Sequence, residues 1–596
     1  MAPDAAQRKA GLDRMIGEMS KTGIEEAADG YTLGWDIVVT YSEKEINDIL
    51  RRKWEKARQD SNRNMLTTIE VHQSSYDDET GMYRYSWRTM ELGPPRVEFG
   101  GTTEPSVNLV LPVENIYYQK SNKEKTKIGE RKKQLDVPNP FDVRLSGIRL
   151  GSVVGKYDAI MQPKQEGKVA NADTLSVPVL SSQKTVVFRE DNTKPTDKDF
   201  ENAWVVLDFP MGETALKVDV SCNVQKKSDD DEVYELAYAQ TNIFRGVANS
   251  YFKDGSDKID ILEYAMATIK NIPEYNGAVT ADLTPVSFRF ATFKTDLQEG
   301  AALSLFIQTL SGSNSGTQMD LQGRWIGSWT KHGISPLPAG YTASILINPH
   351  LAYEAMLKPG LEKNGEFTVE SIMANKEGGI SFSARYQQTW SVGTTYYDYK
   401  GKVYECRLWI DGWYADLKNT DSAPVAKVDW EFSVDNKWKD TSRHERPEAF
   451  GNHILFMEEN MRTQYKLHKD LGLHIQVTDK NFTFDINTDD LHTLWDINTS
   501  PRDADGDWFD RASTAMNNFV SASPPDAIHK KREEWMSGLR PSIDFNAVGL
   551  GFFLTTNLLN PGAKIIKLDP NVLRIPRDIV LVGDVEQGTD TVKAQA

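Results

Sequence analysis

Three aspartates at alternate positions, Asp503, Asp505 and Asp507, offer carboxylate oxygens of the kind that calcium loops use as ligands. The EF-hand spacing then requires glycine at the sixth position and glutamate at the twelfth, but this chain has Trp508 and Thr514 there. The pattern therefore favours a solvated acidic turn that caps the following helix, with a non-standard calcium site as the alternative. We predict no metal site.

The segment Gly312–Gly316 has the glycine spacing of a hydrolase nucleophile elbow, but its central residue is Asn314 and not serine. We interpret it as a hairpin loop. The sequence contains no phosphate-binding Gly-rich loop, no dinucleotide fingerprint and no His-Glu-x-x-His zinc motif. We therefore predict no catalytic residues and no cofactor. A cyclase that folds a hydrophobic biosynthetic intermediate by shape stays an alternative, because such chemistry needs few polar groups.

The stretch Lys120–Lys133 is strongly basic and could contact anionic lipid headgroups or a protein partner. A solvated loop is the simpler interpretation. The whole chain has 69 basic and 86 acidic residues, which gives a formal net charge of -17. This negative balance disfavours broad electrostatic binding of nucleic acid, so we predict no nucleic-acid partner.

The chain has 596 residues, of which 39% are hydrophobic and 26% charged, a composition typical of a globular protein with several cores. No apolar run approaches the roughly 20 residues that a membrane-spanning helix needs. Met1–Ala10 lacks the apolar segment of a secretory signal, and two cysteines, Cys222 and Cys406, exclude a disulfide scaffold. We expect a cytoplasmic protein, or one released without a signal peptide.

Short segments of alternating polarity recur along the chain. Ile69–His72 and Tyr83–Trp87 are two of them, and Leu473–Val477 and Phe482–Ile486 are two more, separated by a turn-like stretch. Because side chains alternate across a strand, each segment has one apolar and one polar face. This pattern predicts antiparallel sheets with one covered side.

Two amphipathic helices are predicted, each directly after a strand. The first follows a strand at 35–41 and begins with a capping box of Ser42 and Glu45. The second follows a strand at 341–347 and extends from Asn348 and Pro349 to a stop at 359–360. The repeated strand–cap–helix order suggests a duplicated architecture. Further helices are predicted at 8–19 and in 508–536, the latter divided by two prolines.

The stretch Gly34–Val38 and the capped helix after it resemble the opening of the clostridial P-forty-seven-type family, accessory proteins of the botulinum neurotoxin cluster. Further similar fragments, in the family's order, are 305–309, 338–347, and 558–562 with 575–578. The resemblance implies the tubular lipid-binding (TULIP) superfamily. The implied fold is α+β and elongated, with long twisted antiparallel sheets wrapped around long amphipathic helices. We expect an N-terminal extension at 1–30, related halves at 31–290 and 291–585, and a mobile tail at 586–596.

The same resemblance implies a soluble protein that holds a lipid or other hydrophobic molecule in an elongated apolar cavity. It also implies an accessory place in a toxin or secretion complex with protein partners. A scaffold whose tubes are filled by their own side chains is the second hypothesis, and the cyclase-like enzyme is the third. We more readily expect a binding protein than an enzyme. Amphipathicity, rather than any family motif, selects the expected lipid contacts: Trp35, Ile46, Ile49, Leu50, Trp54, Tyr341, Ile345, Leu351, Tyr353 and Met356.

Overall fold

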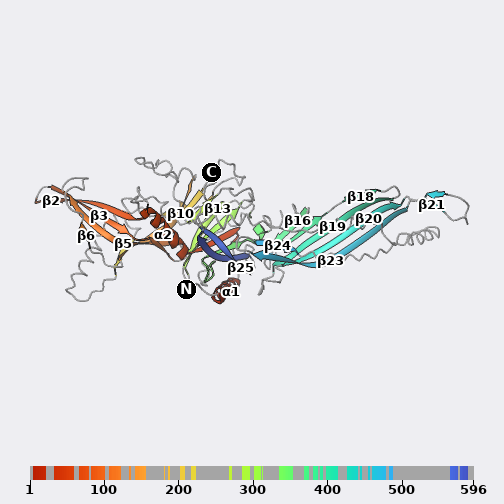
Figure 1. Ribbon diagram of the computed structural model, residues 1–596, viewed down its shortest axis with the longest axis horizontal. Helices are drawn as coiled ribbons and strands as arrows, with labels where there is room; N and C mark the ends of the chain where they lie inside the picture. The colour runs from red at the N-terminus through yellow and green to blue at the C-terminus, as the bar shows by residue number, and fades with distance from the viewer. Residues whose placement is uncertain are drawn as a thin grey trace.

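A computed structural model of the chain shows an elongated molecule built mainly from antiparallel sheets (Figure 1). The structure describes the following residues: 5–21, 32–59, 66–79, 82–100, 106–121, 133–135, 141–155, 180–181, 186–187, 202–208, 217–222, 267–270, 285–294, 301–309, 312, 335–352, 368–374, 380–386, 389–393, 397–413, 426–440, 443–445, 454–456, 459–477, 482–486, 564–574 and 578–587.

A seven-stranded central sheet joins segments that are more than 500 residues apart in the chain. Its order is β25-β26-β15-β1-β14-β13-β9. The strands are β1 (Ile37–Ser42), β9 (Val186–Val187), β13 (Pro285–Phe293), β14 (Ala302–Thr309), β15 (Ala343–Ile347), β25 (Lys564–Arg574) and β26 (Ile579–Gln587).

The central sheet is covered on both faces, unlike the one-sided sheets that the alternating segments predicted. Every residue of β13, β14 and β15 is buried, and so are the first five of β1. In register, Val38 lies opposite Phe306 and Leu346 on one face, and Val39 lies opposite Leu305 and Ile345 on the other. A sheet covered on both sides needs near-continuous apolar strands, which β1, β14 and β15 supply.

The central sheet places the two predicted strand–helix units next to each other. Strand β1 pairs with β14 on one side and with β15 on the other, and β15 pairs in turn with β26. The first strands of the two units therefore lie side by side, and the strand on the other side of each, β14 or β26, belongs to the second expected half. The expected division at 290/291 falls within β13, and the assignment of domains stays a prediction.

A ten-stranded sheet, here called the first distal sheet, extends to one end of the molecule (Figure 1). Its main path is β12-β10-β7-β5-β3-β2, and β4, β6, β8 and β11 pair at its sides. Its strands are β2 (Thr68–Asp77), β3 (Met82–Leu92), β4 (Arg96–Phe99), β5 (Ser106–Ser121), β6 (Lys133–Leu135), β7 (Phe141–Gly155), β8 (Leu180–Ser181), β10 (Asn202–Asp208), β11 (Lys217–Cys222) and β12 (Ala267–Lys270).

A curled second distal sheet extends to the opposite end (Figure 1). It follows the order β16-β17-β19-β20-β23-β24, with β18 paired to β19, and a short β21–β22 pair lies beyond it. The strands are β16 (Thr368–Ala374), β17 (Ile380–Tyr386), β18 (Thr389–Gly393), β19 (Tyr397–Trp413), β20 (Ala426–Asp440), β21 (Arg443–Glu445), β22 (Ile454–Phe456), β23 (Glu459–Val477) and β24 (Phe482–Ile486). The four alternating segments of the sequence all lie in paired strands, as predicted.

Within the part of the chain that the structure describes, helices are fewer and shorter than the long helices expected. Within the described ranges they are α1 (Ala5–Lys21), α2 (Glu43–Gln59) and the start of a third, α6 (Pro349–Leu351). The helix expected at 8–19 is confirmed as α1, and the capped helix is confirmed as α2. The rest of the helix expected from 349 to 359 and the helices expected in 508–536 lie outside the described residues, as do the loop residues 122–132 and the three aspartates at 503–507. None of the described helices has an apolar stretch that could cross a bilayer.

Candidate ligand-contacting site

The helix α2 carries the main group of predicted contact residues. Its first turn is capped as expected, because the Ser42 hydroxyl accepts a hydrogen bond from the Glu45 backbone N–H at 3.3 Å. The apolar stripe after the cap is buried, at spacings that place it on one side of the helix. Its members are Ile46, Ile49, Leu50 and Trp54.

Polar side chains of α2 hold it against the free edge of β4, which is paired with β5 on its other side. The Asn47 side chain donates to the Val97 carbonyl at 2.9 Å and accepts from the Val97 N–H at 2.6 Å. A Glu43 carboxylate oxygen accepts from the Phe99 N–H at 2.7 Å. These contacts satisfy backbone groups that an edge strand otherwise leaves open, and they fix the helix over the first distal sheet.

Burial raises the pKa of Glu43, and the Phe99 N–H and the nearby Lys294 only partly oppose this effect. A raised folded pKa favours the protonated carboxyl, so this group contributes stability below its unfolded pKa and loses it as pH rises. Glu43 therefore serves as a hydrogen-bond acceptor whose charge opposes folding at neutral pH.

Replacing Asn47 with alanine is expected to lower the free energy of unfolding by about 1–3 kcal/mol, because the Val97 N–H and C=O then lose their partner. Denaturant unfolding of the two proteins measures the difference. Asp48→Ala is the matched control, since it removes an adjacent side chain whose exposed ion pair with Arg51 contributes about 0–1 kcal/mol. Equal stability of both variants would contradict this docking role.

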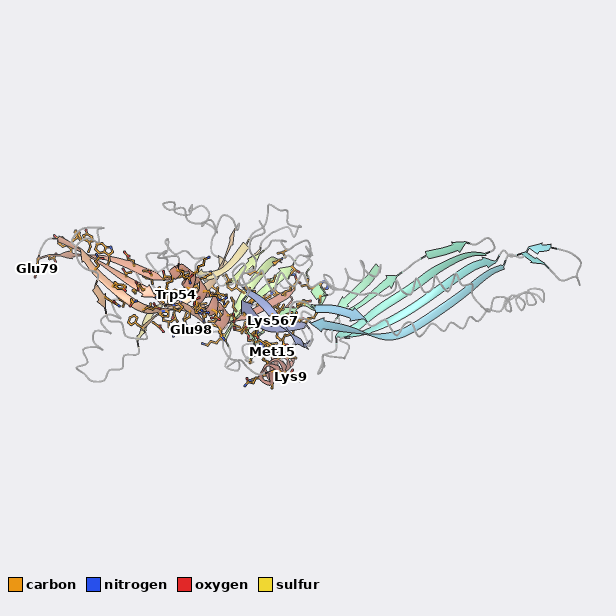
Figure 2. All side chains as sticks on the ribbon, in the orientation of Figure 1. Lys9, Met15, Trp54, Glu79, Glu98 and Lys567 are labelled. Carbon is orange, nitrogen blue, oxygen red and sulfur yellow. The ribbon has the colours of Figure 1, made fainter. Side chains whose placement is uncertain are left out.

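Trp54 ends the apolar stripe and ties α2 to the first distal sheet. Its indole Nε1–H donates to the Leu92 carbonyl at 2.8 Å, and the Arg58 guanidinium lies 4.9 Å from the ring centroid. Figure 2 shows Trp54 at the position where α2 lies on that sheet. A buried tryptophan usually has a hydrogen-bond partner for its indole N–H, so this bond holds the Trp54 side chain in place.

The first distal sheet, to which α2 is tied through Asn47, Glu43 and Trp54, has an apolar inner face. Leu109 lies opposite both Val97 and Leu145, and Leu111 lies opposite Val143; all five side chains are buried. The alternate residues form the outer face, where Arg96 pairs with Asp142 at 2.8 Å and Arg144 pairs with Glu98. This sheet therefore has the one covered side that the alternating pattern predicted, at least where β4, β5 and β7 meet.

The other predicted contact residues, Trp35 and those of the second strand–helix unit, are not gathered in one place. Ile345 lies on the central-sheet face that carries Val39. Leu351 is buried in α6, whose start is capped by the Asn348 side chain accepting from the His350 N–H at 2.8 Å. Tyr353 and Met356 lie outside the described residues.

Trp35 and Tyr341 lie in a separate cluster on the opposite face of the central sheet. Their neighbours there include Val38, Phe306 and Leu346, and the rings of Trp35 and Phe306 are 6.4 Å apart in an edge-on arrangement. Leu12 and Met15 of α1 complete this cluster. The sequence predicted α1 but gave it no part in the site, although apolar residues at positions 12, 15 and 16 have the spacing of a buried helix face.

The hydroxyl of Tyr341 donates to the Asp569 carboxylate at 3.1 Å. Burial raises the pKa of Tyr341, and the neighbouring negative charge of Asp569 adds to this effect. Burial also raises the pKa of Tyr41, which is fully enclosed. Both phenols are therefore neutral in the folded protein throughout the physiological range.

These raised pKa values predict a loss of stability in alkaline solution. A folded-state pKa above the unfolded value of about 10 contributes stability below pH 10, and that stability disappears as pH rises towards the folded-state pKa. Melting temperatures measured from pH 8 to pH 11 should fall most steeply above pH 10. Tyr341→Phe should reduce this slope; an unchanged slope in that variant would contradict the assignment.

A buried carboxylate that the sequence did not single out lies beside the Trp35 cluster. Asp36 is 1% exposed, and its Oδ2 accepts from Gln308 Nε2 at 2.5 Å, from the Thr309 N–H at 2.7 Å and from the Thr309 hydroxyl at 3.0 Å. Its backbone carbonyl accepts from the Asn348 N–H at 2.8 Å. Asp36 therefore links β1 to β14 and to the end of β15, as a structural rather than a chemical group.

The described residues contain no group of three or more His, Cys, Asp or Glu side chains arranged for a metal ion. Gly312, the described residue of the glycine-rich segment, packs its backbone against the Asp36 carboxylate, and its N–H donates to the Thr309 carbonyl at 3.1 Å. It thus closes a turn after β14; the rest of the segment lies outside the described residues, so the hairpin-loop interpretation stays a prediction.

No protein-family model and no curated protein sequence matches the chain. Among solved structures, the chain is similar to P47 from Clostridium botulinum A2, with 12% identity and a TM-score of 0.39, over 93% of this chain and 98% of that one. It is also similar to a crystal structure of lipopolysaccharide binding protein, with 9% identity and a TM-score of 0.25, over 93% and 99% of the two chains. Both TM-scores are below 0.5, so the family expected from the sequence stays a prediction.

Proposed function

We propose that the protein binds a lipid or another hydrophobic molecule along the apolar wall formed by α2 and the inner face of the first distal sheet. The observation that supports this most is the junction of two apolar surfaces: the α2 stripe, fixed to the β4 edge by Asn47, and the buried row of β4, β5 and β7. An acyl chain transferred from water to such a surface gains about 0.8 kcal/mol per CH₂.

The finer assignment is a TULIP-like protein of the P-forty-seven type that acts as an accessory component of a toxin or secretion complex. The paired strand–helix units, the two distal sheets at opposite ends and the shared central sheet support the architectural part of this proposal. The accessory role and its protein partners rest on the sequence resemblance alone, and isolation of the native complex tests them.

A ligand-free scaffold is the second candidate, and one observation favours it. The Trp35 cluster on the other face of the central sheet is filled by the chain's own Leu12 and Met15. If the α2 wall is filled in the same way, the interior serves only to hold the elements together.

Titration with the fluorescent fatty acid 12-NBD-stearate distinguishes the two candidates. The binding proposal predicts saturable fluorescence enhancement, and Ile49→Trp should weaken it at least about tenfold, because a larger side chain then occupies the wall. Lys44→Trp, on the exposed side of α2, is the matched control and should bind as the unmodified protein does. A folded protein without saturable enhancement would favour the scaffold.

A further inference from the structure

The helix α1 covers the apolar face of the central sheet on the side of Trp35 and Tyr341. Leu12 and Met15 are buried in that cluster, and Ile16 packs against it. Figure 2 shows Met15 on the side of α1 towards the sheet and Lys9 on its outer side. The cluster draws on β1, β13, β14, β15 and β26, so one short helix spans the junction of both strand–helix units.

Arg8 fastens α1 to the second unit through two contacts. Arg8 pairs with Asp584 of β26 at 2.6 Å, and its guanidinium lies 5.0 Å from the centre of the Tyr341 ring. Tyr341 in turn donates to Asp569 of β25. The pair is partly open to solvent, with 24% and 33% of the two side chains exposed, so salt and solvent weaken it.

The composition of α1 makes it dependent on this docking. It contains Gly11 and Gly17, and glycine is the poorest helix former after proline. A helix of 17 residues with two glycines is marginal without its partner surface. Loss of the Arg8 contacts therefore favours release of the whole helix.

The two glycines have opposite surroundings. A Cβ atom on Gly11 would lie 2.5 Å from the Ala339 carbonyl oxygen, whereas a Cβ atom on Gly17 would have no atom within 4 Å. Alanine at position 11 must push α1 away from the 335–341 segment. Alanine at position 17 improves the helix and disturbs nothing around it.

The surface beneath α1 is suited to an amphiphile. It is apolar across Val38, Phe306 and Leu346, and the indole Nε1–H of Trp35 is buried there with no hydrogen-bond partner in the described part of the chain. A buried donor without a partner is costly, and a ligand oxygen would satisfy it. Release of α1 would expose this apolar surface, and exposed apolar surfaces of this kind often mark binding sites.

We propose that α1 is a releasable cover, and that the face beneath it admits single-chain amphiphiles whose polar end accepts a hydrogen bond. This inference rests on the proposed function for the identity of the ligand, but the movement of α1 is independent of it. The cover controls how fast a ligand enters the face beneath α1, which is a surface separate from the α2 wall.

Cysteine labelling measures release of α1 without any ligand. Met15→Cys, in a chain with Cys222→Ser and Cys406→Ser, should react slowly with a maleimide because position 15 is 1% exposed. Adding Gly11→Ala or Asp584→Asn should raise the rate several-fold, and Gly17→Ala should lower it about fivefold. Leu50→Cys, equally buried in α2, is the control and should not respond to these changes. An unchanged labelling rate at position 15 in all three variants would overturn the proposal that α1 is a releasable cover.

Stopped-flow mixing with 12-NBD-stearate then tests access. The association rate should rise in Gly11→Ala and fall in Gly17→Ala, with melting curves confirming that both proteins are folded. Labelling that changes while the association rate stays constant would overturn the access role. Absence of saturable binding in every protein would overturn both the proposed function and the role of α1 in ligand access. The cysteine labelling would then still show whether α1 is released from the central sheet.

Discussion

Replacing Ile46 with aspartate is expected to destabilise the protein by several kcal/mol, the largest effect of any single change considered for α2. Ile46 is fully buried in the apolar stripe that faces the interior. An unpaired carboxylate there must either stay charged in an apolar environment or take up a proton with a strongly raised pKa. Because whole domains are stable by only about 5–15 kcal/mol, a large fraction of the folded population should be lost.

Thermal and urea unfolding of the Ile46→Asp protein measure this effect, and Lys44→Asp is the control. Lys44 lies in the first turn of the same helix with an exposed side chain, where a negative charge interacts favourably with the helix dipole. The control should therefore melt at or slightly above the temperature of the unmodified protein. An Ile46→Asp protein that melts at that same temperature would show that α2 does not pack as described.

Replacing Asp36 with alanine is expected to cost about 3–5 kcal/mol, since removal of one buried charged partner leaves the others unsatisfied. The groups left without an acceptor are the Gln308 amide and the N–H and hydroxyl of Thr309. Because these residues join β1 to β14, the loss should loosen the junction at the centre of the molecule.

Asp36→Asn separates the charge from the hydrogen bonds. Asparagine keeps one acceptor oxygen, so it should cost clearly less than alanine in the same urea unfolding experiment. Hydrogen exchange at the backbone amides of β14 should increase more in the alanine variant than in the asparagine variant. If alanine and asparagine were equally well tolerated, the buried network would have no structural role.

The sequence predicted α2 in detail because its signals are local. A capping serine, a glutamate three residues later and apolar residues at helical spacing determine the start and the buried side of the helix within a few turns. The antiparallel strands were predictable for the same reason, since alternation over five residues suffices. The sequence therefore predicts where strands occur, but it does not predict which strands pair.

The central sheet could not be predicted because its pairings join distant parts of the chain. Strand β1 lies between β14 and β15, about 265 and 305 residues away by register, and no local pattern states which strands become neighbours. The buried role of Asp36 follows from the same contacts: beside Trp35 in the sequence it is an ordinary acidic residue, and its partners are on β14. The sequence also did not predict that α1 contributes to the Trp35 cluster, although the spacing of Leu12, Met15 and Ile16 is that of a buried helix face.

The chosen contact residues lie on more than one surface, and the reason is physical. Amphipathicity finds side chains that leave water, but it does not distinguish a ligand wall from an ordinary core. The α2 stripe belongs to a helix tied to the first distal sheet, whereas Trp35 and Tyr341 belong to the surface beneath α1. Ile345 lies on the other face of the central sheet, so the predicted residues serve at least two separate surfaces.

Native mass spectrometry of the purified protein tests hydrophobic ligand binding most directly. We expect a population whose mass exceeds that of the chain by one or a few lipid molecules, which organic extraction removes and incubation with fatty acid restores. Denaturing spectra of the same sample provide the mass of the bare chain. Folded protein that stays bare even with fatty acid at saturating concentration would contradict the proposal and leave the scaffold in its place.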